Sequence, residues 1–216
     1  MRCYAGKKVV ITGGTQGIGL AVARSLAAGG AEVLLTGRDE RDVEAVRDEL
    51  PVHVLRSDAA SMADIHALGE AAEDRLGELD LLFVNAGHAE FEPLEAVTET
   101  VFDRTFDVTV KGAFFTAQRL APLVRDGGAI VFSTAAPGPG SSVLSGALAA
   151  VAAFTGALAG ELRRIRVNAV RPGLGCRRGD CGEIAAAVLF LGFDATLTTG
   201  SVLHADGGQG APWPPR

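Results

Sequence analysis

Hydrophobic and polar positions follow two different periods along this chain of 216 residues. Short apolar runs rich in Val, Ile and Leu indicate buried strands, and longer segments with an apolar residue at every third or fourth position indicate helices. Strands are predicted at residues 8–11, 32–36, 53–57, 81–84, 129–133, 166–170 and 201–204. Helices are predicted between them, at residues 17–28, 40–50, 63–76, 98–124, 142–162 and 183–191.

This alternation of strands and helices is typical of a parallel sheet, because each parallel connection needs a crossover that covers one face of the sheet. The sequence therefore predicts the α/β class, as a doubly wound Rossmann fold with a seven-stranded parallel sheet and helices on both faces. The length suits one domain that covers residues 1–216. Only the tail 207–216, rich in Gly and Pro, is expected to be irregular.

The predicted helix 142–162 is apolar on every side, and residues 127–160 include no charged side chain. Such a run raises the question of a membrane span. Its apolar residues are mostly Ala and Gly, and strand-like and turn-like segments interrupt the run. We interpret it as a buried helix at a subunit contact, and we expect no membrane insertion. A strand begins within a few residues of Met1, with no apolar signal segment before it, which predicts a cytoplasmic protein.

Charge and cysteine content narrow the classes of function further. The formal net charge of −6 argues against general binding to nucleic acids. Cys3, Cys176 and Cys181 are too few and too scattered for a disulfide framework. No spacing of His and Cys resembles a zinc site, so no metal is expected.

A glycine-rich turn joins the first predicted strand to the first helix. Small residues allow the backbone to approach a pyrophosphate, and the N–H groups and dipole at a helix start favour its negative charge. A strand before the glycines and a helix after them make this pattern specific for a dinucleotide. The residues of the turn that we expect to contact the cofactor are Gly13, Thr15, Gln16, Gly17, Ile18 and Gly19.

The choice of dinucleotide is expected to depend on Arg38. This residue follows the second strand, about where a dinucleotide site places the group that selects the ribose. An aspartate there would accept a hydrogen bond from the free 2′-hydroxyl of NAD. A guanidinium can pair bidentately with a 2′-phosphate, so Arg38 predicts NADP(H). The alternative is that Arg38 is a solvated surface arginine beside Asp39 and Arg41.

Further motifs follow the later strands in a fixed order. They are Asp58 after the third strand, Asn85-Ala86-Gly87 after the fourth, Asn168 with Pro172-Gly173 at the sixth, and Asp206-Gly207-Gly208 after the seventh. Together with the glycine turn, this series resembles the short-chain dehydrogenase/reductase family from about residue 6 to about residue 209. The resemblance implies that Asp58 contacts the adenine, that Asn85, Ala86 and Gly87 line the cofactor, and that Pro172 and Gly173 approach the nicotinamide.

The resemblance fails at the reaction centre. Members of this family use a tyrosine as proton donor and a lysine, four residues later, that lowers the pKa of the tyrosine. Here the only tyrosine is Tyr4, and no lysine follows Lys111. Matching the segments places Leu144 at the tyrosine position and Leu148 at the lysine position. The customary proton donor is therefore absent.

Two other positions of the reaction centre also differ. Ala135 falls at the serine that positions the carbonyl oxygen in the family, and Thr109 falls at the asparagine that fixes a water relay. Only residues 174–182 separate Gly173 from the last predicted helix, where the family inserts a longer substrate-covering lobe. A shallow, open pocket is expected, with poor exclusion of water.

Three polar side chains near these positions are candidates to replace the missing groups. His88 follows the Asn85-Ala86-Gly87 motif and can exchange protons at neutral pH, although a loop histidine without a role is the alternative. Ser133 and Ser142 could each donate a hydrogen bond to a carbonyl. Hydroxyl groups are poor proton donors, and a serine at a helix start is also an ordinary N-cap.

The sequence leaves three functions open. The first is an NADP(H)-dependent reductase of a small ketone that works without the tyrosine, with the proton supplied in some cases by the substrate itself. The second is a catalytically silent subunit that forms a homo- or hetero-oligomer through helices 98–124 and 142–162, because the resemblance implies pairing there. The third is a scaffold that senses NADP. The complete phosphate turn with Arg38 favours a protein that still binds the cofactor.

Overall fold

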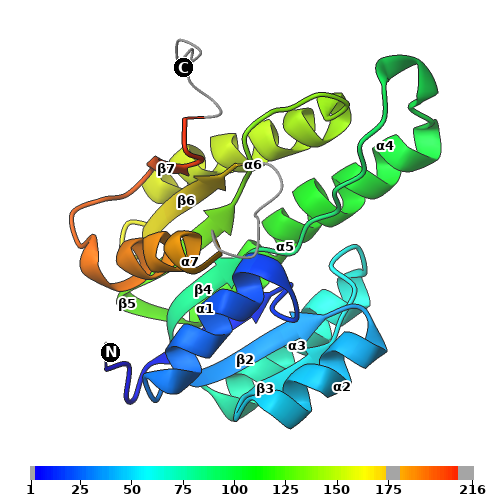
Figure 1. Ribbon diagram of the computed structural model, residues 1–216. Helices are drawn as coiled ribbons and strands as arrows, with labels where there is room; N and C mark the ends of the chain where they lie inside the picture. Colours follow the sequence, from blue (N-terminus) through cyan, green and yellow to red (C-terminus); the bar gives the residue numbers. More distant parts are fainter. Residues whose placement is uncertain (1–2, 174–180, 209–216) are drawn as a thin grey trace.

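Seven parallel strands form one sheet in the computed structural model, which describes residues 3–173 and 181–208 (Figure 1). The strands are β1 (Lys8–Thr12), β2 (Glu32–Gly37), β3 (His53–Arg56), β4 (Leu79–Val84), β5 (Val124–Ser133), β6 (Arg166–Pro172) and β7 (Val202–Ala205). Their order in the sheet is β3-β2-β1-β4-β5-β6-β7, and all neighbours pair in parallel. The predicted doubly wound α/β fold is confirmed.

The central strands are continuous apolar runs because helices cover both faces of the sheet. β4 is buried at all six of its positions. Successive side chains of a strand point to opposite faces. Val9 and Ile11 of β1 accordingly belong to one hydrophobic cluster, and Val10 between them belongs to the other. A parallel sheet buried on both faces shows this composition rather than an alternation of apolar and polar residues.

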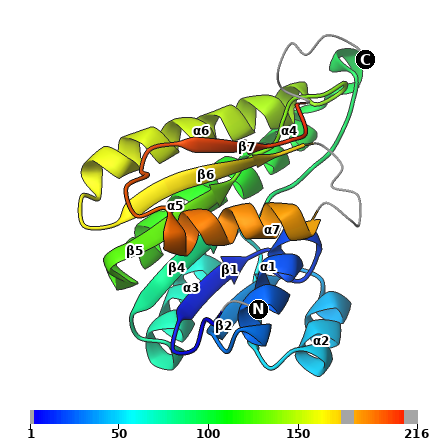
Figure 2. The same cartoon turned by 60° about the vertical axis from the view of Figure 1, so that its left-hand side comes forward.

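Seven α-helices lie in the described part of the chain, and most of them cover the two faces of the sheet (Figures 1 and 2). They are α1 (Gly17–Ala28), α2 (Glu40–Glu49), α3 (Met62–Arg75), α4 (Glu99–Phe106), α5 (Gly112–Leu120), α6 (Ser142–Glu161) and α7 (Cys181–Leu189). Buried residues of α1, α2 and α7 pack in one cluster, and buried residues of α3, α5 and α6 pack in the other. Side chains of Asp39, Ser61 and Thr98 accept backbone N–H groups and so fix where α2, α3 and α4 begin.

The predicted single helix 98–124 is divided in the structure. α4 is followed by a π-helical turn, η2 (Asp107–Lys111), then by α5 and by a 3₁₀ turn, η3 (Ala121–Leu123). Pro122 lacks a backbone N–H and ends the helical run. The prediction that Val124 is helical is wrong, because Val124 begins β5 and pairs with Leu79 of β4.

β5 begins five residues before the predicted start at residue 129, and the remaining boundaries agree with the predicted ones within one or two residues. A short 3₁₀ turn, η1 (Leu94–Ala96), precedes α4, and a π-helical turn, η4 (Phe190–Asp194), follows α7. The predicted irregular tail lies outside the described residues from position 209 onward, as do residues 174–180 of the segment that precedes α7.

One face of α6 is covered within the chain and the other is open. Leu144, Ala147, Val151 and Thr155 are buried. In the described part of the chain, α6 is the one helix long and apolar enough to cross a membrane, and 22% of that apolar segment is buried. The chain by itself covers only the face of α6 that carries these residues. A contact with another subunit on the open face stays a prediction.

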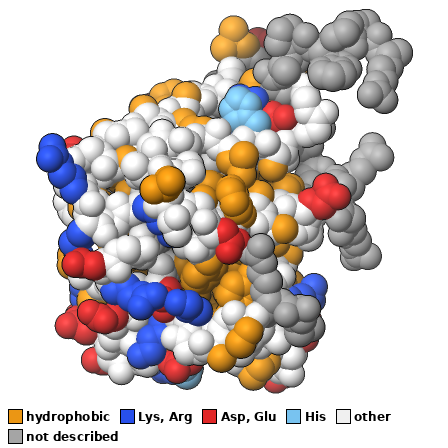
Figure 3. Space-filling model, turned by 90° about the vertical axis from the view of Figure 1, so that its left-hand side faces the viewer, with side chains coloured by type: hydrophobic (Ala, Val, Ile, Leu, Met, Phe, Trp, Pro, Cys, Tyr) orange, Lys and Arg blue, Asp and Glu red, His pale blue; other side chains and the backbone are white. Residues whose placement is uncertain are grey.

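The face of the molecule that presents the edge strand β7 and α7 also exposes apolar side chains, which are gathered among charged ones (Figure 3). Phe190 follows α7 directly and is 46% exposed. Leu197, in the connection to β7, is almost completely exposed. Single apolar residues are normal on a protein surface, so these two positions alone identify no partner.

A buried ion pair joins β6 to the segment that follows β7. Arg171 Nη2 donates to Asp206 Oδ2 at 2.8 Å, and the Gly208 N–H donates to Asp206 Oδ1 at 3.0 Å. Burial alone would raise the pKa of the Asp206 carboxyl group, but the two hydrogen bonds and the charge of Arg171 outweigh it and hold the pKa below its ordinary value. The ionised carboxylate therefore stabilises the folded state.

Replacing Asp206 by Asn should lower the free energy of unfolding at neutral pH by about 2 kcal/mol, because Arg171 then stays largely buried without its counter-charge. The folded-state pKa of Asp206 lies below the unfolded one. The carboxylate therefore contributes fully above about pH 4, and this contribution is lost as the pH falls through the folded-state pKa. Urea unfolding across a pH series should show the difference between wild type and Asp206→Asn shrinking below about pH 4.

The matched control is Glu49→Gln, which breaks the exposed pair of Glu49 with Arg24. Exposed pairs contribute little, so this variant should unfold close to wild type at neutral pH. An equal loss in both variants would contradict the assignment of a stabilising role to the buried pair.

Candidate functional site

The strand order reverses between β1 and β4, which lie side by side at the centre of the sheet. α1 follows β1 on one face, and α5 lies on the opposite face in the connection that follows β4 (Figure 2). The two connections diverge at the carboxyl ends of these strands and leave a crevice there. In open α/β sheets this crevice is the usual place for a ligand.

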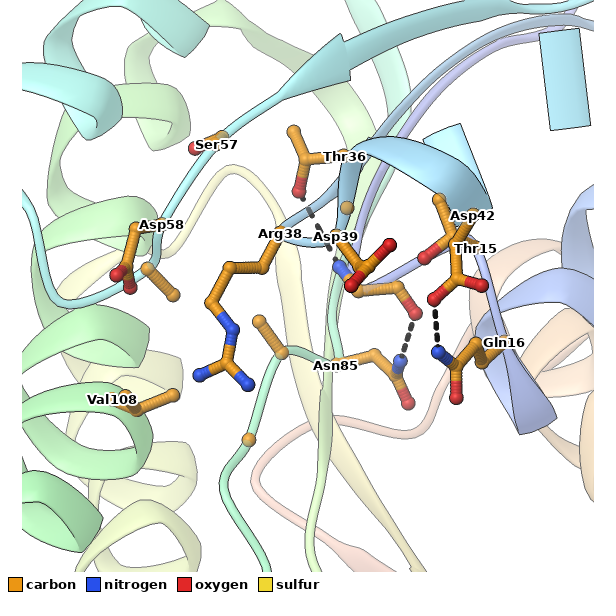
Figure 4. A pocket seen from close by; sticks show the side chains of 15 residues that line it. Thr15, Gln16, Thr36, Arg38, Asp39, Asp42, Ser57, Asp58, Asn85 and Val108 are labelled. Carbon is orange, nitrogen blue, oxygen red and sulfur yellow. Dashed lines mark hydrogen bonds between the residues drawn. The ribbon is translucent and has the colours of Figure 1, made fainter. Parts of the chain in front are cut away.

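The turn of residues 12–19, here called the nucleotide turn, is tied to the end of β4. Thr12 Oγ1 accepts the N–H groups of Asn85 and Ala86 at 3.0 and 3.1 Å. In return, Asn85 Nδ2 donates to the carbonyl oxygens of Thr12 at 3.2 Å and of Gly13 at 2.9 Å. Figure 4 shows the Asn85 amide directed at the turn. These four bonds hold the turn and the end of β4 as one unit.

The turn is also tied to β2 on its other side. Gly14 N–H donates to Thr36 O at 2.7 Å, and Gly13 N–H donates to Thr36 Oγ1 at 3.4 Å. Gly13 has φ of 63°, a backbone conformation that favours glycine. A Cβ at this position would also lie 3.0 Å from Ala86 Cα. The close contact between turn and β4 therefore needs glycine at position 13.

The start of α1 is open to an anion. The N-cap residue Gln16 makes no side-chain bond to the helix, and the first turn of α1 holds no acidic residue. The Gln16 amide instead bonds to the carboxylate of Asp42 (Figure 4). A Cβ on Gly17 would meet no atom within 4 Å, so the backbone faces open space. Free N–H groups and the helix dipole at such a start fit a phosphate or pyrophosphate.

A cavity of about 300 Å³, here the first cavity, lies between the nucleotide turn and the ends of β2, β3 and β4 (Figure 4). It is lined by Gly13, Thr15, Gln16, Thr36, Gly37, Arg38, Asp39, Asp42, Ser57, Asp58, Ala59, Asn85, Ala86, Gly87 and Val108. The exposed side chain of Arg38 extends into this space. Among the described residues no carboxylate pairs with its guanidinium group, which leaves that group free for an anionic ligand.

A second cavity of about 380 Å³ adjoins the first, and Asn85, Ala86 and Gly87 line both. Its other lining residues are Ile18, Val84, His88, Ala89, Phe91, Thr109, Ala113, Ser133, Thr134, Ala135, Leu144, Leu148, Val151, Pro172 and Gly173. Most of these side chains are apolar. Leu144 and Leu148 face the space in which the resemblance would place the tyrosine and the lysine.

Few polar groups reach the second cavity. The Thr134 hydroxyl donates to Val170 O at 3.0 Å and is thereby occupied. Ser133 lines the cavity, whereas Ser142 is exposed at the start of α6 and is not among the lining residues. His88 lines the cavity, and its Nε2 lies 3.0 Å from Glu90 Oε2. Of the three candidates to replace the missing groups, the structure thus places His88 and Ser133 at the second cavity and Ser142 away from it.

The structure brings most of the predicted cofactor residues to these two cavities. Gly13, Thr15, Gln16, Arg38 and Asp58 line the first cavity. Ile18, Pro172 and Gly173 line the second, and the predicted Asn85, Ala86 and Gly87 line both. Gly17 and Gly19 line neither cavity within the described part of the chain, but both shape the start of α1.

Several residues of the site were not predicted. Thr12 holds the end of β4 through its hydroxyl, and its place directly before the glycines is the pattern that could have indicated it. Gly37 allows Thr15 to pack closely, because a Cβ on Gly37 would lie 2.3 Å from Thr15 Cγ2. Glu90 pairs with His88 across two positions of a loop, which no sequence period reveals.

Comparison with known proteins agrees with this geometry. A family model described as short chain dehydrogenase matches residues 7–175. An uncharacterized oxidoreductase of Methylorubrum extorquens is 34% identical, with 94% of this chain and 97% of that protein covered. The hydroxynaphthalene reductase-like protein Arp2 of Metarhizium brunneum is 32% identical, with 80% of this chain and 69% of its own length covered.

A solved structure extends the likeness to three dimensions. A short chain dehydrogenase of Burkholderia cenocepacia, in complex with NADP, superposes on this chain with a TM-score of 0.85 at 27% identity. The superposition covers 96% of this chain and 99% of that one.

The role of Gly19 leads to a prediction about the nucleotide turn. A Cβ at position 19 would lie 2.2 Å from Gly13 O, which is backbone and cannot move without breaking the turn. Gly19→Ala should therefore lower the free energy of unfolding by at least about 2 kcal/mol.

Gly146→Ala is the matched control, because Gly146 is exposed on α6 with no atom within 4 Å of the added Cβ. It should raise stability by about 0.5–1 kcal/mol. Thermal unfolding measures both; equal effects would contradict the packing argument.

Proposed function

This chain belongs to the short-chain dehydrogenase/reductase family, a family of oxidoreductases, and we propose that it binds NADP(H) and reduces a small ketone without the customary tyrosine. The observation that carries the proposal is the pair of adjoining cavities. One has the features of a dinucleotide site, and the other is apolar and lies at the reacting end.

The first cavity supports NADP(H) rather than NAD. A free guanidinium group and an open helix start are two positive features at opposite sides of one cavity. In the proposal, Arg38 pairs with the 2′-phosphate, Asp58 contacts the adenine, and the nucleotide turn binds the pyrophosphate. Gly13, Thr15, Gln16, Gly17, Ile18 and Gly19 form that turn, Asn85, Ala86 and Gly87 line the middle of the cofactor, and Pro172 and Gly173 approach the nicotinamide. The bound NADP of the Burkholderia relative supports this choice.

The second cavity supports a carbonyl substrate with apolar substituents. The reduced nicotinamide would supply the hydride there. Leu144, Leu148 and Ala135 replace the polar groups of the family's reaction centre with apolar surface. Such walls bind aromatic or aliphatic groups by burial and offer nothing to a hydroxyl-rich substrate. The name of the Metarhizium relative, a hydroxynaphthalene reductase-like protein, supports an aromatic ketone.

A catalytically silent subunit is the second candidate function, and the open face of α6 is the observation that favours it. Gly146, Gly156 and Gly160 are exposed there, and a Cβ on each would meet no atom within 4 Å. Small residues allow another helix to approach closely. In this proposal helices 98–124 and 142–162 pair with a second copy or with a catalytically complete relative. An NADP-sensing scaffold would share the cofactor site and differ in having no turnover.

The cofactor proposal predicts that Arg38→Ala lowers the preference for NADPH over NADH by about 10- to 100-fold, because charge-assisted hydrogen bonds to the 2′-phosphate are lost. Fluorescence titration with each reduced cofactor measures the two dissociation constants. The matched control is Arg41→Ala, since Arg41 is exposed close by on α2 but does not line the cavity. It should keep the wild-type ratio. A ratio unchanged by Arg38→Ala would refute the NADP(H) assignment.

One experiment, NADPH oxidation by the purified chain, distinguishes the reductase from the silent subunit. The purified chain should oxidise NADPH when mixed with aryl ketones such as acetophenone, clearly faster than it does without a ketone. The silent subunit predicts no oxidation by the chain alone and co-elution with a tyrosine-bearing relative. Tight NADPH binding without turnover would favour the silent subunit or the sensor over the reductase.

A further inference from the structure

The loop that follows β4 is held in place at two points. The His88 N–H donates to Thr109 Oγ1 at 3.4 Å, and the Glu92 N–H donates to Gly140 O at 2.9 Å. Thr109 is buried in the π-helical turn η2, and Gly140 lies just before α6. π-helical turns such as η2 often occur at functional sites. The two bonds fix the loop whose residues His88, Ala89 and Phe91 line the second cavity.

His88 is the one titratable side chain that lines the second cavity in the described part of the chain. Its side chain is 17% exposed, whereas that of Glu90 is 38% exposed. The bond from His88 Nε2 to Glu90 Oε2 fixes the orientation of the imidazole ring. It leaves Nδ1 as the ring nitrogen available to another partner, because a protonated imidazole donates from both nitrogens.

Within residues 3–173 and 181–208, no charged side chain other than His88 lines the second cavity. The charged residues of η2, Asp107 and Lys111, pair with each other at 3.1 Å and do not line the cavity. The described lining residues of α1, α5, α6, β4, β5 and β6 carry no ionisable side chain. Of the hydroxyl groups, that of Thr134 is already occupied by Val170 O. His88 is therefore the strongest proton donor that the described residues offer.

We propose that His88, oriented by Glu90, donates the proton that completes ketone reduction in the second cavity. This inference rests on the proposed reductase function. The carbonyl carbon gains the hydride of the reduced nicotinamide, the carbon–oxygen π bond breaks, and the oxygen takes the proton from Nδ1 of the imidazolium ion. The neutral imidazole then regains a proton from solvent. In total, a ketone, NADPH and one proton give an alcohol and NADP⁺.

His88 touches the substrate in this scheme and is a catalytic residue, whereas Glu90 is a positioning residue that acts through His88. The tyrosine of the family needs a nearby lysine to work at neutral pH, but an imidazole exchanges protons there without one. The replacement of the lysine position by Leu148 is compatible with this donor.

The first test uses His88→Gln, which keeps hydrogen-bonding capacity but has no proton acidic enough to be transferred. With acetophenone and other aryl ketones, its kcat should fall about 100-fold, while KM and the affinity for NADPH stay within about 2-fold of wild type. The wild-type rate should decrease as the pH rises, because only a protonated donor can complete the reaction. His88→Gln should lack this decrease. His66→Gln, an exposed histidine of α3, is the matched control and should behave like wild type.

Glu90→Gln separates positioning from a merely structural role. It keeps the size of the side chain and removes the charged acceptor of His88 Nε2, so kcat should fall while KM and the affinity for NADPH stay within about 2-fold of wild type. A merely structural role would lower the thermal unfolding midpoint and leave the kcat of the folded protein unchanged. This variant also keeps the proposal testable if His88→Gln folds poorly.

A second measurement needs no turnover. The chain has four histidines, and the imidazole proton signal of His88 in an NMR spectrum is the one missing from His88→Gln. Adding acetophenone to the protein saturated with NADP⁺ should shift the His88 signal and leave that of His66 unchanged. Ketone binding without a shift of the His88 signal would overturn the inference.

The outcomes distinguish the two proposals. Equal kcat and pH dependence in wild type and His88→Gln would overturn the role of His88 and leave the reductase intact. A wild-type protein that binds NADPH but oxidises it with none of the ketones would overturn the reductase, and the role of His88 with it.

Discussion

The bonds between Asn85 and the nucleotide turn are the constraint on which the rest of the site depends. They join the carboxyl ends of β1 and β4, the two strands between which the sheet order reverses. Asn85 can reach both carbonyl groups only because Gly13 and Gly19 bring no Cβ into the contact. The same contact sets the border between the two cavities, since Asn85, Ala86 and Gly87 line both. The two cavities are thus joined at one backbone junction.

The two cavities have diverged in different ways from the family pattern. The first keeps a full turn, an open helix start and a free guanidinium group, which have little physical use except to bind an anion. The second presents Leu144, Leu148 and Ala135 where the resemblance would place the tyrosine, the lysine and the serine. These side chains leave a cavity of about 380 Å³, which is large enough to admit a ligand.

Much of the fold could be predicted because the relevant patterns are local. Apolar runs and helical periods place the seven strands, and parallel strands that end at one edge bring Arg38, Asp58 and Asn85 to one cavity. The break of the predicted helix 98–124 could not be seen, since no apolar position is missing at the π-helical turn η2. Val124 fits a helix and a strand equally by composition. Only its pairing with Leu79 decides between them.

The candidate chemistry was predicted less well, because it depends on the orientation of side chains. Ser133 and Ser142 are equally plausible in sequence, but the end of β5 faces the cavity and the exposed start of α6 does not. The pairing of His88 with Glu90 depends on a loop conformation that Thr109 and Gly140 fix from distant parts of the chain. A tyrosine donor depends on its lysine, so we expect the two residues to be lost together. A histidine donor needs only a carboxylate to orient it. The joint absence of tyrosine and lysine, beside a His–Glu pair at the same cavity, is therefore more consistent with a replaced proton donor than with two independent losses.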